Sequence, residues 1–323
     1  MKTAILIGAG FSEEFGCPLA WGITRELKNF LTPTKLINLN SKWGEELNNF
    51  EKSVIDFIIQ LLKDNRLHYE SILGSVQARY CQINNPYKED YYGAYLWLTE
   101  IIYWVLYLYH IKNPIYIKES VKFYKGLKKL ADNNKPLWIF SLNHDLLLEM
   151  LADEFSLPIS SGFSSERISL PLRDINGVKI GQQEFSFLSR QDLDNGNFNF
   201  IPFGSQGINL LKIHGSLDIF GYKDELNYLK IIPNGKGIDA WTKTLEMVNT
   251  NLVWILDGRK IKCTNEIAVE DGANTAQFLR RTLLAGAFKF DNRISQNAPT
   301  EILEFFKSQI NHFDNLIIIG YSF

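Results

Sequence analysis

Four short apolar runs, each ending in glycine or polar residues, constrain the fold of this 323-residue chain most strongly. They cover residues 3–8 (TAILIG), 137–141 (LWIFS), 208–213 (INLLKI) and 315–319 (NLIII). Continuous apolar runs of this length are typical of strands that are buried on both faces of a parallel sheet. Because ligands bind beyond the carboxyl ends of such strands, we expect the turns after the four runs to line one crevice.

The segments between these runs favour an α/β fold, a Rossmann-like doubly wound parallel sheet with a large helical insertion. Apolar spacings of three and four over residues 43–133 predict three or four helices, inserted between the first two core strands. Their many Tyr and Trp residues suit either an interface or an internal helical core. We expect loops, short strands and hairpins in the insertions at 160–205 and 220–275, and helices at 276–288 and 300–311.

Composition and charge exclude several classes of protein. Hydrophobic residues make up 46% of the chain and charged residues 22%, which is ordinary for a soluble protein with a real core. The net charge of −2 gives no global basic field, so we expect no nucleic-acid ligand for this domain, although this net charge is compatible with a local basic patch. No apolar stretch reaches the roughly 20 residues of a membrane span, so we expect no membrane partner. Cys17, Cys81 and Cys263 form no C-x-x-C pair, which predicts no zinc or other metal site and a reducing, cytoplasmic setting.

The turn after the first run reads Gly8-Ala9-Gly10-Phe11-Ser12. Glycines after a strand let a phosphate approach backbone N–H groups, and the Ser12 hydroxyl can add a contact or cap the next helix. The same glycines also suit a turn that only packs a helix on a strand, and both interpretations remain open. Glu13 stands where the G-x-G-x-x-G fingerprint of dehydrogenases has its third glycine.

Polar residues also follow the second and third runs. Asn143 and Asp145 can contact a ribose hydroxyl or position a water, or they can simply cap the helix that follows. His214, which precedes Gly215, can act as a general base near neutral pH or can be a hydrogen-bonded structural histidine. The remaining histidines show no metal-ligand spacing such as H-x-x-x-H.

Taken in this order, the motifs resemble those of the sirtuin superfamily: GAG-x-S with a later G-x-P, then N-x-D, then HG. Here they read GAGFS with Gly16-Cys17-Pro18, SLNHD and KIHGS, and the terminal IIIGYSF resembles the family's last core strand and its G-x-S turn. The four-cysteine zinc module of deacetylating sirtuins is missing, since only Cys263 lies in that region, and Leu19-Ala20-Trp21 replaces the usual Asp-Phe-Arg. In both respects the chain is similar to the divergent sirtuin-like domains of bacterial antiphage defence proteins.

This resemblance implies a single NAD-binding domain over residues 1–323. The implied activity is hydrolysis of the nicotinamide–ribose bond of NAD to nicotinamide and ADP-ribose, in antiphage defence by NAD depletion. Asn143 and His214 are the implied catalytic residues. NAD is the substrate and no other cofactor is expected. The expected contacts to NAD are Gly8, Ala9, Gly10, Phe11, Ser12, Pro18, Asp145, Gly320 and Ser322.

Two other functions fit the same residues. One is a catalytically silent regulatory module that binds NAD or ADP-ribose, and the other is an ADP-ribosyltransferase. We further expect a homo-oligomer, together with a partner protein or further domain that controls activity.

Overall fold

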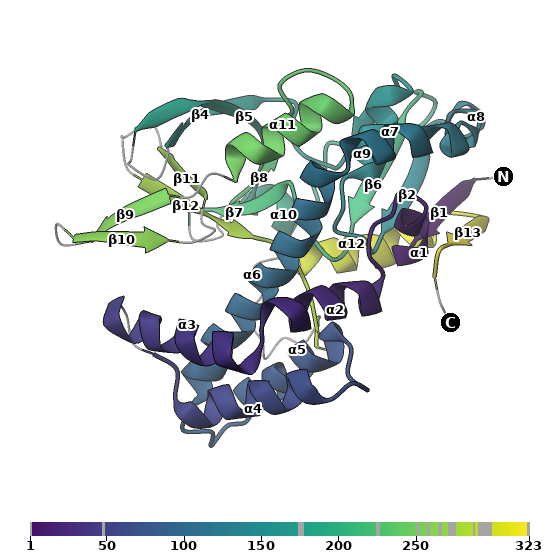
Figure 1. Cartoon of the computed structure of the whole chain (residues 1–323). Helices are drawn as coiled ribbons and strands as arrows, with labels where there is room; N and C mark the ends of the chain where they lie inside the picture. Colours follow the sequence, from purple (N-terminus) through teal and green to yellow (C-terminus); the bar gives the residue numbers. More distant parts are fainter. Residues whose placement is uncertain are drawn as a thin grey trace. The chain divides into compact units, whose positions relative to one another are not determined.

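The structure is a computed structural model, and it describes residues 2–46, 49–173, 178–223, 227–249, 252–256, 259–263, 267–270, 276–286, 288–289 and 299–321 (Figure 1). Its helices are α1 Ala9–Glu13, α2 Ala20–Phe30, α3 Pro33–Glu46, α4 Lys52–Lys63, α5 Tyr69–Tyr80, α6 Lys88–Lys112, α7 Pro114–Ser120, the 3₁₀ helix η1 Val121–Tyr124, α8 Gly126–Asn133, α9 Leu147–Glu154, α10 Arg190–Asn195, α11 Ile238–Val248 and α12 Glu301–Ile310. Its strands are β1 Thr3–Ile7, β2 Leu137–Ser141, β3 Ile159–Ser160, β4 Arg167–Arg173, β5 Lys179–Ser189, β6 Ile208–Lys212, β7 Ile219–Tyr222, β8 Asn227–Ile231, β9 Leu252–Leu256, β10 Arg259–Cys263, β11 Ile267–Glu270, β12 Ala276–Arg281 and β13 Asn315–Ile319.

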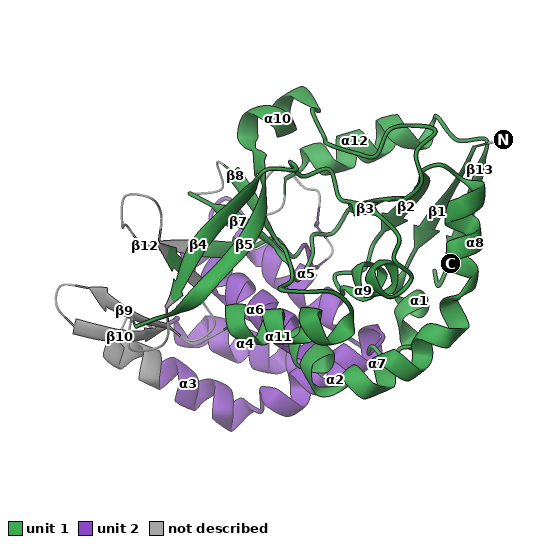
Figure 2. Ribbon diagram, turned by 90° about the horizontal axis from the view of Figure 1, so that it is seen from above, with its two compact units in different colours: residues 1–17, 107–283, 297–323 green, residues 18–106, 284–296 purple. Residues whose placement is uncertain are grey.

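The chain divides into two compact units (Figure 2). Unit 1 comprises residues 1–17, 107–283 and 297–323, and unit 2 comprises residues 18–106 and 284–296. Every element between β1 and β2 is helical, and these helices start at Ala9, well before the expected insertion at 43–133.

Unit 1 contains a five-stranded parallel sheet in the order β13-β1-β2-β6-β3. The prediction of an α/β, Rossmann-like parallel sheet is therefore confirmed. The four apolar runs form β1, β2, β6 and β13, and they lie side by side. The helix predicted at 300–311 is α12.

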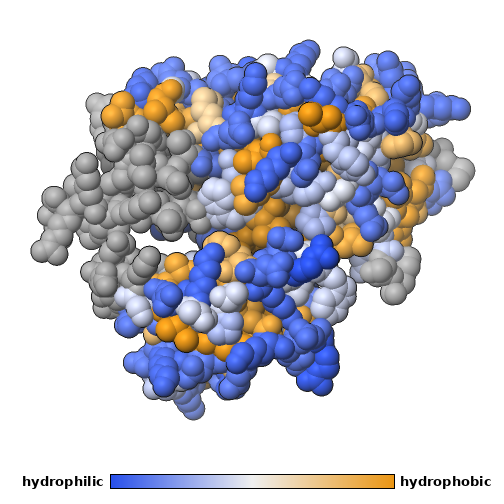
Figure 3. Space-filling view, in the orientation of Figure 1, coloured by the Kyte–Doolittle hydropathy of each residue, from blue (hydrophilic) through white to orange (hydrophobic). Residues whose placement is uncertain are grey.

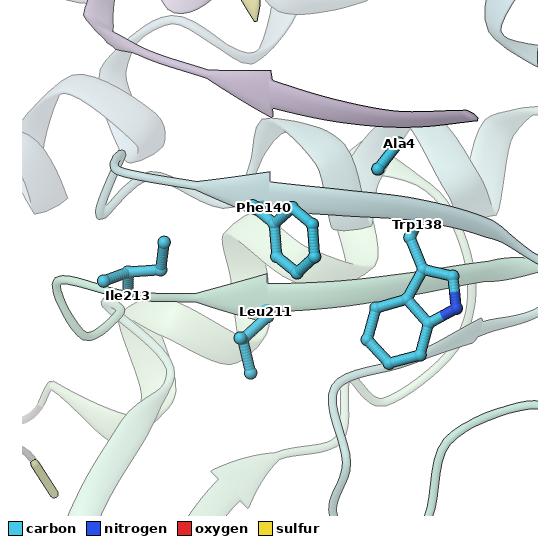
Figure 4. Close-up of a cluster of buried hydrophobic side chains, with 5 residues drawn as sticks. All are labelled: Ala4, Trp138, Phe140, Leu211 and Ile213. Carbon is cyan, nitrogen blue, oxygen red and sulfur yellow. The ribbon is translucent and has the colours of Figure 1, made fainter. Parts of the chain in front are cut away.

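One face of this sheet is covered by aromatic side chains. Ala4, Trp138, Phe140, Leu211 and Ile213 form a buried cluster on and just beyond β1, β2 and β6 (Figure 4). Side chains of α12 pack against this cluster, with the ring centroids of Phe140 and Phe306 4.9 Å apart. The alternate residues Ile139 and Leu210 point to the opposite face and are also buried, so both faces of the sheet are covered.

The run at 315–319 forms a strand but not a buried one. Leu316, Ile317, Ile318 and Ile319 are each between 37% and 42% exposed, because β13 is the edge strand of the sheet. In Figure 3, hydrophobic residues reach the surface on the right-hand side of the view, where Figure 1 places β13. An apolar run alone does not distinguish an edge strand from a central one.

Unit 1 also contains a closed antiparallel barrel in the order β11-β12-β7-β8-β5-β4. The ranges 160–205 and 220–275, where we expected loops, short strands and hairpins, contain four strands of this barrel and part of a fifth. They also contain the helix α11. The prediction of a helix at 276–288 is wrong, because residues 276–281 form strand β12. Leu279 and Arg281 are buried and Arg280 is exposed, a period of two that is fixed by pairing with β7 and β11.

Unit 2 is helical and includes α2 to α5 and most of α6. Its second segment is tied to it by the hydrogen bond from Tyr95 Oη to the Ala285 carbonyl oxygen, 3.1 Å long. Lys289 Nζ also contacts Glu70 Oε1 at 2.6 Å. Across the described residues of both units, no helix combines the length and apolar character needed to cross a membrane.

Candidate functional site

The parallel register brings the four predicted turns to one edge of the sheet. Ile7 pairs with both Ser141 and Ile319, and Ser141 pairs with Lys212, so the strands end at a common level. Gly8, Asn143, His214 and Gly320 therefore lie within two residues of the same carboxyl edge. This convergence was predicted from the sequence and is confirmed by the strand pairing.

The turn Gly8–Ser12 packs closely against the turn after β13. The Gly8 N–H donates to the Ile319 carbonyl oxygen at 2.9 Å, and the Gly10 N–H donates to the Gly320 carbonyl oxygen at 2.8 Å. A Cβ atom on Gly10 would lie 2.9 Å from the Gly320 Cα, and Gly320 itself has φ +67°. Close approach of two backbones therefore explains these glycines, and both N–H groups already have acceptors inside the protein.

Ser12 lies at the centre of a buried chain of hydrogen bonds. Asn143 Nδ2 donates to Ser12 Oγ at 2.9 Å, and Ser12 Oγ donates to Asp145 Oδ2 at 2.6 Å. The three side chains are between 2% and 8% exposed. These hydrogen bonds join α1 to the loop after β2, more than 130 residues apart in the sequence, and they help to fix the orientation of the Asn143 amide.

The amide of Asn143 is held in one orientation by its acceptors. Its Nδ2 group also donates to the Gly8 carbonyl oxygen at 2.9 Å, and a carbonyl oxygen can only accept. Both Nδ2 protons are therefore used. Within the described part of the chain, Oδ1 accepts no hydrogen bond. Asn143 thus presents a fixed acceptor at the edge of the sheet.

Asp145 stabilises the start of α9. Its Oδ1 accepts from the Leu147 N–H at 3.2 Å, and its backbone carbonyl oxygen accepts from Lys212 Nζ. A carboxylate near a helix N-terminus is stabilised by the free N–H groups and the helix dipole. Asp145 is not the N-cap of α9, which is Leu146, but its side chain binds the N–H of the first helical residue, and its second oxygen orients Ser12.

A buried network of four charged side chains lies beneath this edge. Glu149 contacts Lys212 Nζ at 3.5 Å and Lys230 Nζ at 3.3 Å, and Lys230 also pairs with Asp218. The side chains of Glu149, Lys212 and Asp218 are at most 2% exposed. Burial alone would lower the pKa of Lys230, but the carboxylates of Asp218 and Glu149 outweigh it and raise that pKa. The network connects α9, β6 and the turn after His214 to barrel strand β8.

His214 is half-buried and follows β6 at the same edge. Its ring centroid lies 6.2 Å from that of His144, which occupies the variable position of the N-x-D motif. A Cβ atom on Gly215 would overlap with the Thr282 carbonyl oxygen, and Gly215 has φ +79°. The glycine of the HG motif therefore allows the barrel segment at Thr282 to approach the backbone beside His214.

Three side chains that support this edge were not identified as site residues from the sequence. Tyr124 Oη donates to the Phe11 carbonyl oxygen at 2.8 Å, and Tyr109 Oη donates to the Phe15 carbonyl oxygen at 2.6 Å. The fully buried His110 accepts from the Leu146 N–H through Nε2 at 3.1 Å. Because its Nε2 is the acceptor, a neutral His110 carries its proton on Nδ1.

Cys17 lies close to this edge but is not suited to act as a nucleophile. Its side chain is buried, and burial together with the nearby charge of Asp145 raises the pKa of the thiol well above its usual value. Among the residues that the structure describes, no group of three His, Cys, Asp or Glu side chains is arranged to hold a metal ion.

The remaining expected NAD contacts are Ala9, Phe11, Pro18 and Ser322. Ala9 is exposed and Phe11 packs edge-on against the ring of Tyr124 at 5.0 Å. Pro18 belongs to unit 2, and Ser322 lies outside the described residues. An open surface hollow of about 1000 Å³ is lined by unit 2 residues between Ser53 and Tyr91, and none of the expected site residues is part of its lining.

The geometry defines a Rossmann-like domain with a polar edge at the carboxyl ends of its strands. Compared with protein-family models and with curated proteins, the sequence gives no match.

Proposed function

We propose that this chain hydrolyses the nicotinamide–ribose bond of NAD and that it acts in antiphage defence by depleting NAD. The observation that carries the proposal is the fixed amide of Asn143, whose Oδ1 is left as an acceptor two residues beyond β2. His214 follows the neighbouring strand at the same level. An acceptor and an imidazole on adjacent strand ends can together hold and deprotonate one water molecule.

In this mechanism NAD lies across the carboxyl edge of the sheet, where ligands of such folds bind. The bond between the ribose C1′ and the nicotinamide nitrogen breaks, and its electron pair neutralises the pyridinium ring. The ribose centre becomes oxocarbenium-like, as in glycoside hydrolysis. The water that Asn143 Oδ1 holds forms the new bond to C1′, and His214 takes its proton. Nicotinamide and ADP-ribose are the products.

Ser12 and Asp145 act as positioning residues in this proposal. The Ser12 hydroxyl is used as donor to Asp145 and as acceptor from Asn143, and one Asp145 oxygen accepts from the Leu147 N–H at the start of α9. These contacts hold the Asn143 amide in place before substrate binds. A preformed hydrogen-bond geometry lowers the reorganisation needed in the transition state.

The first test is NAD consumption by the purified chain, with the products separated by chromatography. Asn143→Ala and His214→Ala are compared with His312→Ala, an exposed histidine on the same unit, as a matched control. We expect each of the first two variants to lose about 10²- to 10⁴-fold in rate, with a fully active control. The melting temperature should stay unchanged in His214→Ala, whereas Asn143→Ala should lower it, because the buried Asn143 amide donates to Ser12 and to the Gly8 carbonyl oxygen.

Other outcomes separate the alternatives. Radiolabel from NAD that appears on protein or nucleic acid indicates an ADP-ribosyltransferase. Binding of NAD or ADP-ribose without turnover, measured by calorimetry, indicates the silent regulatory module. Turnover that is unchanged in the His214→Ala variant contradicts the role of this residue.

A further inference from the structure

The segment from α7 to α8 carries a concentration of positive charge that the overall composition hides. Residues 114–133 contain five lysines and two acidic residues, whereas the whole chain has a net charge of −2. The backbone stays in the right-handed helical region at Ser120 and Lys125, where α7, η1 and α8 meet. The three elements therefore follow one another with no extended residue between them.

Four of the lysines share one face of this segment. Lys118, Lys122, Lys125 and Lys129 follow one another at spacings of four, three and four, and all are exposed. We call these four residues the lysine stripe. It places about one charge on each helical turn of the segment. In Figure 3, hydrophilic residues surround the position of α8.

The opposite face of the same segment is packed into unit 1. Ile117, Leu127 and Ala131 are buried, and Tyr124 stacks on Phe15 with ring centroids 4.4 Å apart. An amphipathic helix binds a membrane surface by inserting its apolar face. Here that face is already covered by the protein, so the lysine stripe is not the polar side of a membrane-binding helix.

Most of the lysine stripe has no acidic partner within the described residues. Lys118 pairs with Asp239 at 2.6 Å, but Lys122, Lys125 and Lys129 form no ion pair there. Beside them, the ring of Phe123 is 71% exposed, with Lys122 Nζ 5.1 Å from its centroid. A row of cations next to an exposed aromatic ring combines two features that bind single strands, phosphate contact and base stacking.

We propose that the lysine stripe and Phe123 bind single-stranded nucleic acid. The lysines contact successive phosphates and Phe123 stacks on one base. This site is separate from the proposed NAD hydrolysis and does not depend on it. It also revises the expectation, drawn from the net charge, that nucleic acid is not a ligand.

The test measures fluorescence anisotropy of a labelled 20-nucleotide oligothymidylate with the full chain, in the absence of NAD, over a series of salt concentrations. The variant Lys122→Gln/Lys125→Gln/Lys129→Gln is compared with Lys179→Gln/Lys236→Gln/Lys243→Gln. The control removes the same charge from three other exposed lysines of unit 1. Phe123→Ala tests stacking.

We expect the stripe variant to reduce the slope of log K against log salt by about 2, because each phosphate that a lysine neutralises adds about 0.7 to that slope. Phe123→Ala should weaken binding roughly 5- to 150-fold. The control variant should bind as the wild type does. Equal weakening in both triple variants would show a non-specific charge effect and overturn the proposal, as would the absence of binding by the wild type. Binding to vesicles with 30% phosphatidylserine but not to the oligonucleotide would also overturn it.

Discussion

Lys212 gives the sharpest test of how the polar edge is held together. Its Nζ donates to the Asp145 carbonyl oxygen and lies 3.5 Å from Glu149, and its side chain is only 2% exposed. Lys212→Met keeps most of the volume but removes the charge. Glu149 keeps its contact with Lys230 at 3.3 Å, but the network then has two carboxylates and one ammonium group.

Removing one partner from a buried ion pair costs about 3–5 kcal/mol, because the remaining charge stays desolvated. We therefore expect Lys212→Met to lower the free energy of unfolding by this amount. For a domain of 150–250 residues this lowers the melting temperature by about 6–20 °C. The exposed Lys179→Met is the control, and its effect should stay within about 0.5 kcal/mol.

The assay is urea unfolding followed by tryptophan fluorescence, supported by thermal melts. Lys212→Met/Glu149→Leu completes a double-mutant cycle and leaves the pair of Lys230 and Asp218 in place. The double variant should be more stable than the sum of the single effects predicts, by about 0.5–3 kcal/mol. A decrease below about 1 kcal/mol for Lys212→Met, or strictly additive effects, would refute the reasoning.

Two further predictions concern the backbone and the pH dependence of stability. Gly215→Ala should lower the free energy of unfolding, measured by thermal melts, by more than about 3 kcal/mol, because the added Cβ overlaps with a carbonyl oxygen. Gly196→Ala, at φ +67° with open space around it, should lower it by only about 1–2 kcal/mol. Similar decreases for the two variants would contradict the steric explanation. The raised pKa of Lys230 implies that its stabilisation is fully present below the unfolded value of about 10.4 and is lost as pH rises through the folded pKa. Between pH 8 and 12, the free energy of unfolding should therefore fall more steeply with pH in the wild type than in Lys230→Met. Parallel stability curves for the two proteins would exclude a stabilising role for the Lys230 charge.

The central sheet was predictable because its signals are local. Each of the runs that form β1, β2, β6 and β13 is continuous in sequence and ends in a turn, and the structure assigns a strand to each. The parallel order then follows from the helices between them. The exposure of β13 was not predictable from the sequence, since it depends on which strand lies at the edge.

The barrel was missed because its strands are defined by partners far along the chain. The strand β12 pairs with β7, about 60 residues earlier, and this pairing overrides the helical appearance of its sequence. Strands β4 and β5 are rich in polar residues and lie in a region where we expected loops and short hairpins but no barrel. Non-local pairing of this kind leaves no periodic signal in a single segment.

At the candidate site, too, the sequence identified individual residues but not the residues to which they bond. The sequence identified Asn143, Asp145 and Ser12, but it gave no signal for the hydrogen bonds between them, because Ser12 lies more than 130 positions from the other two. It gave no signal for the pairing of Glu149 with Lys230, which lie on different elements.

The hydrogen bonds of these residues determine which polar atoms remain for a ligand. One oxygen of Asp145 accepts from the Leu147 N–H at the start of α9, and the other accepts from Ser12. The Ser12 hydroxyl both donates and accepts. The N–H groups of Gly8 and Gly10 bond to the turn after β13. Most of the polar groups in the motifs thus shape the edge itself. Asn143 Oδ1 differs from them, because its amide is fixed by two donated bonds while the oxygen accepts none within the described residues. For this reason the Asn143→Ala variant tests chemistry at this edge more directly than a change at any of the glycines.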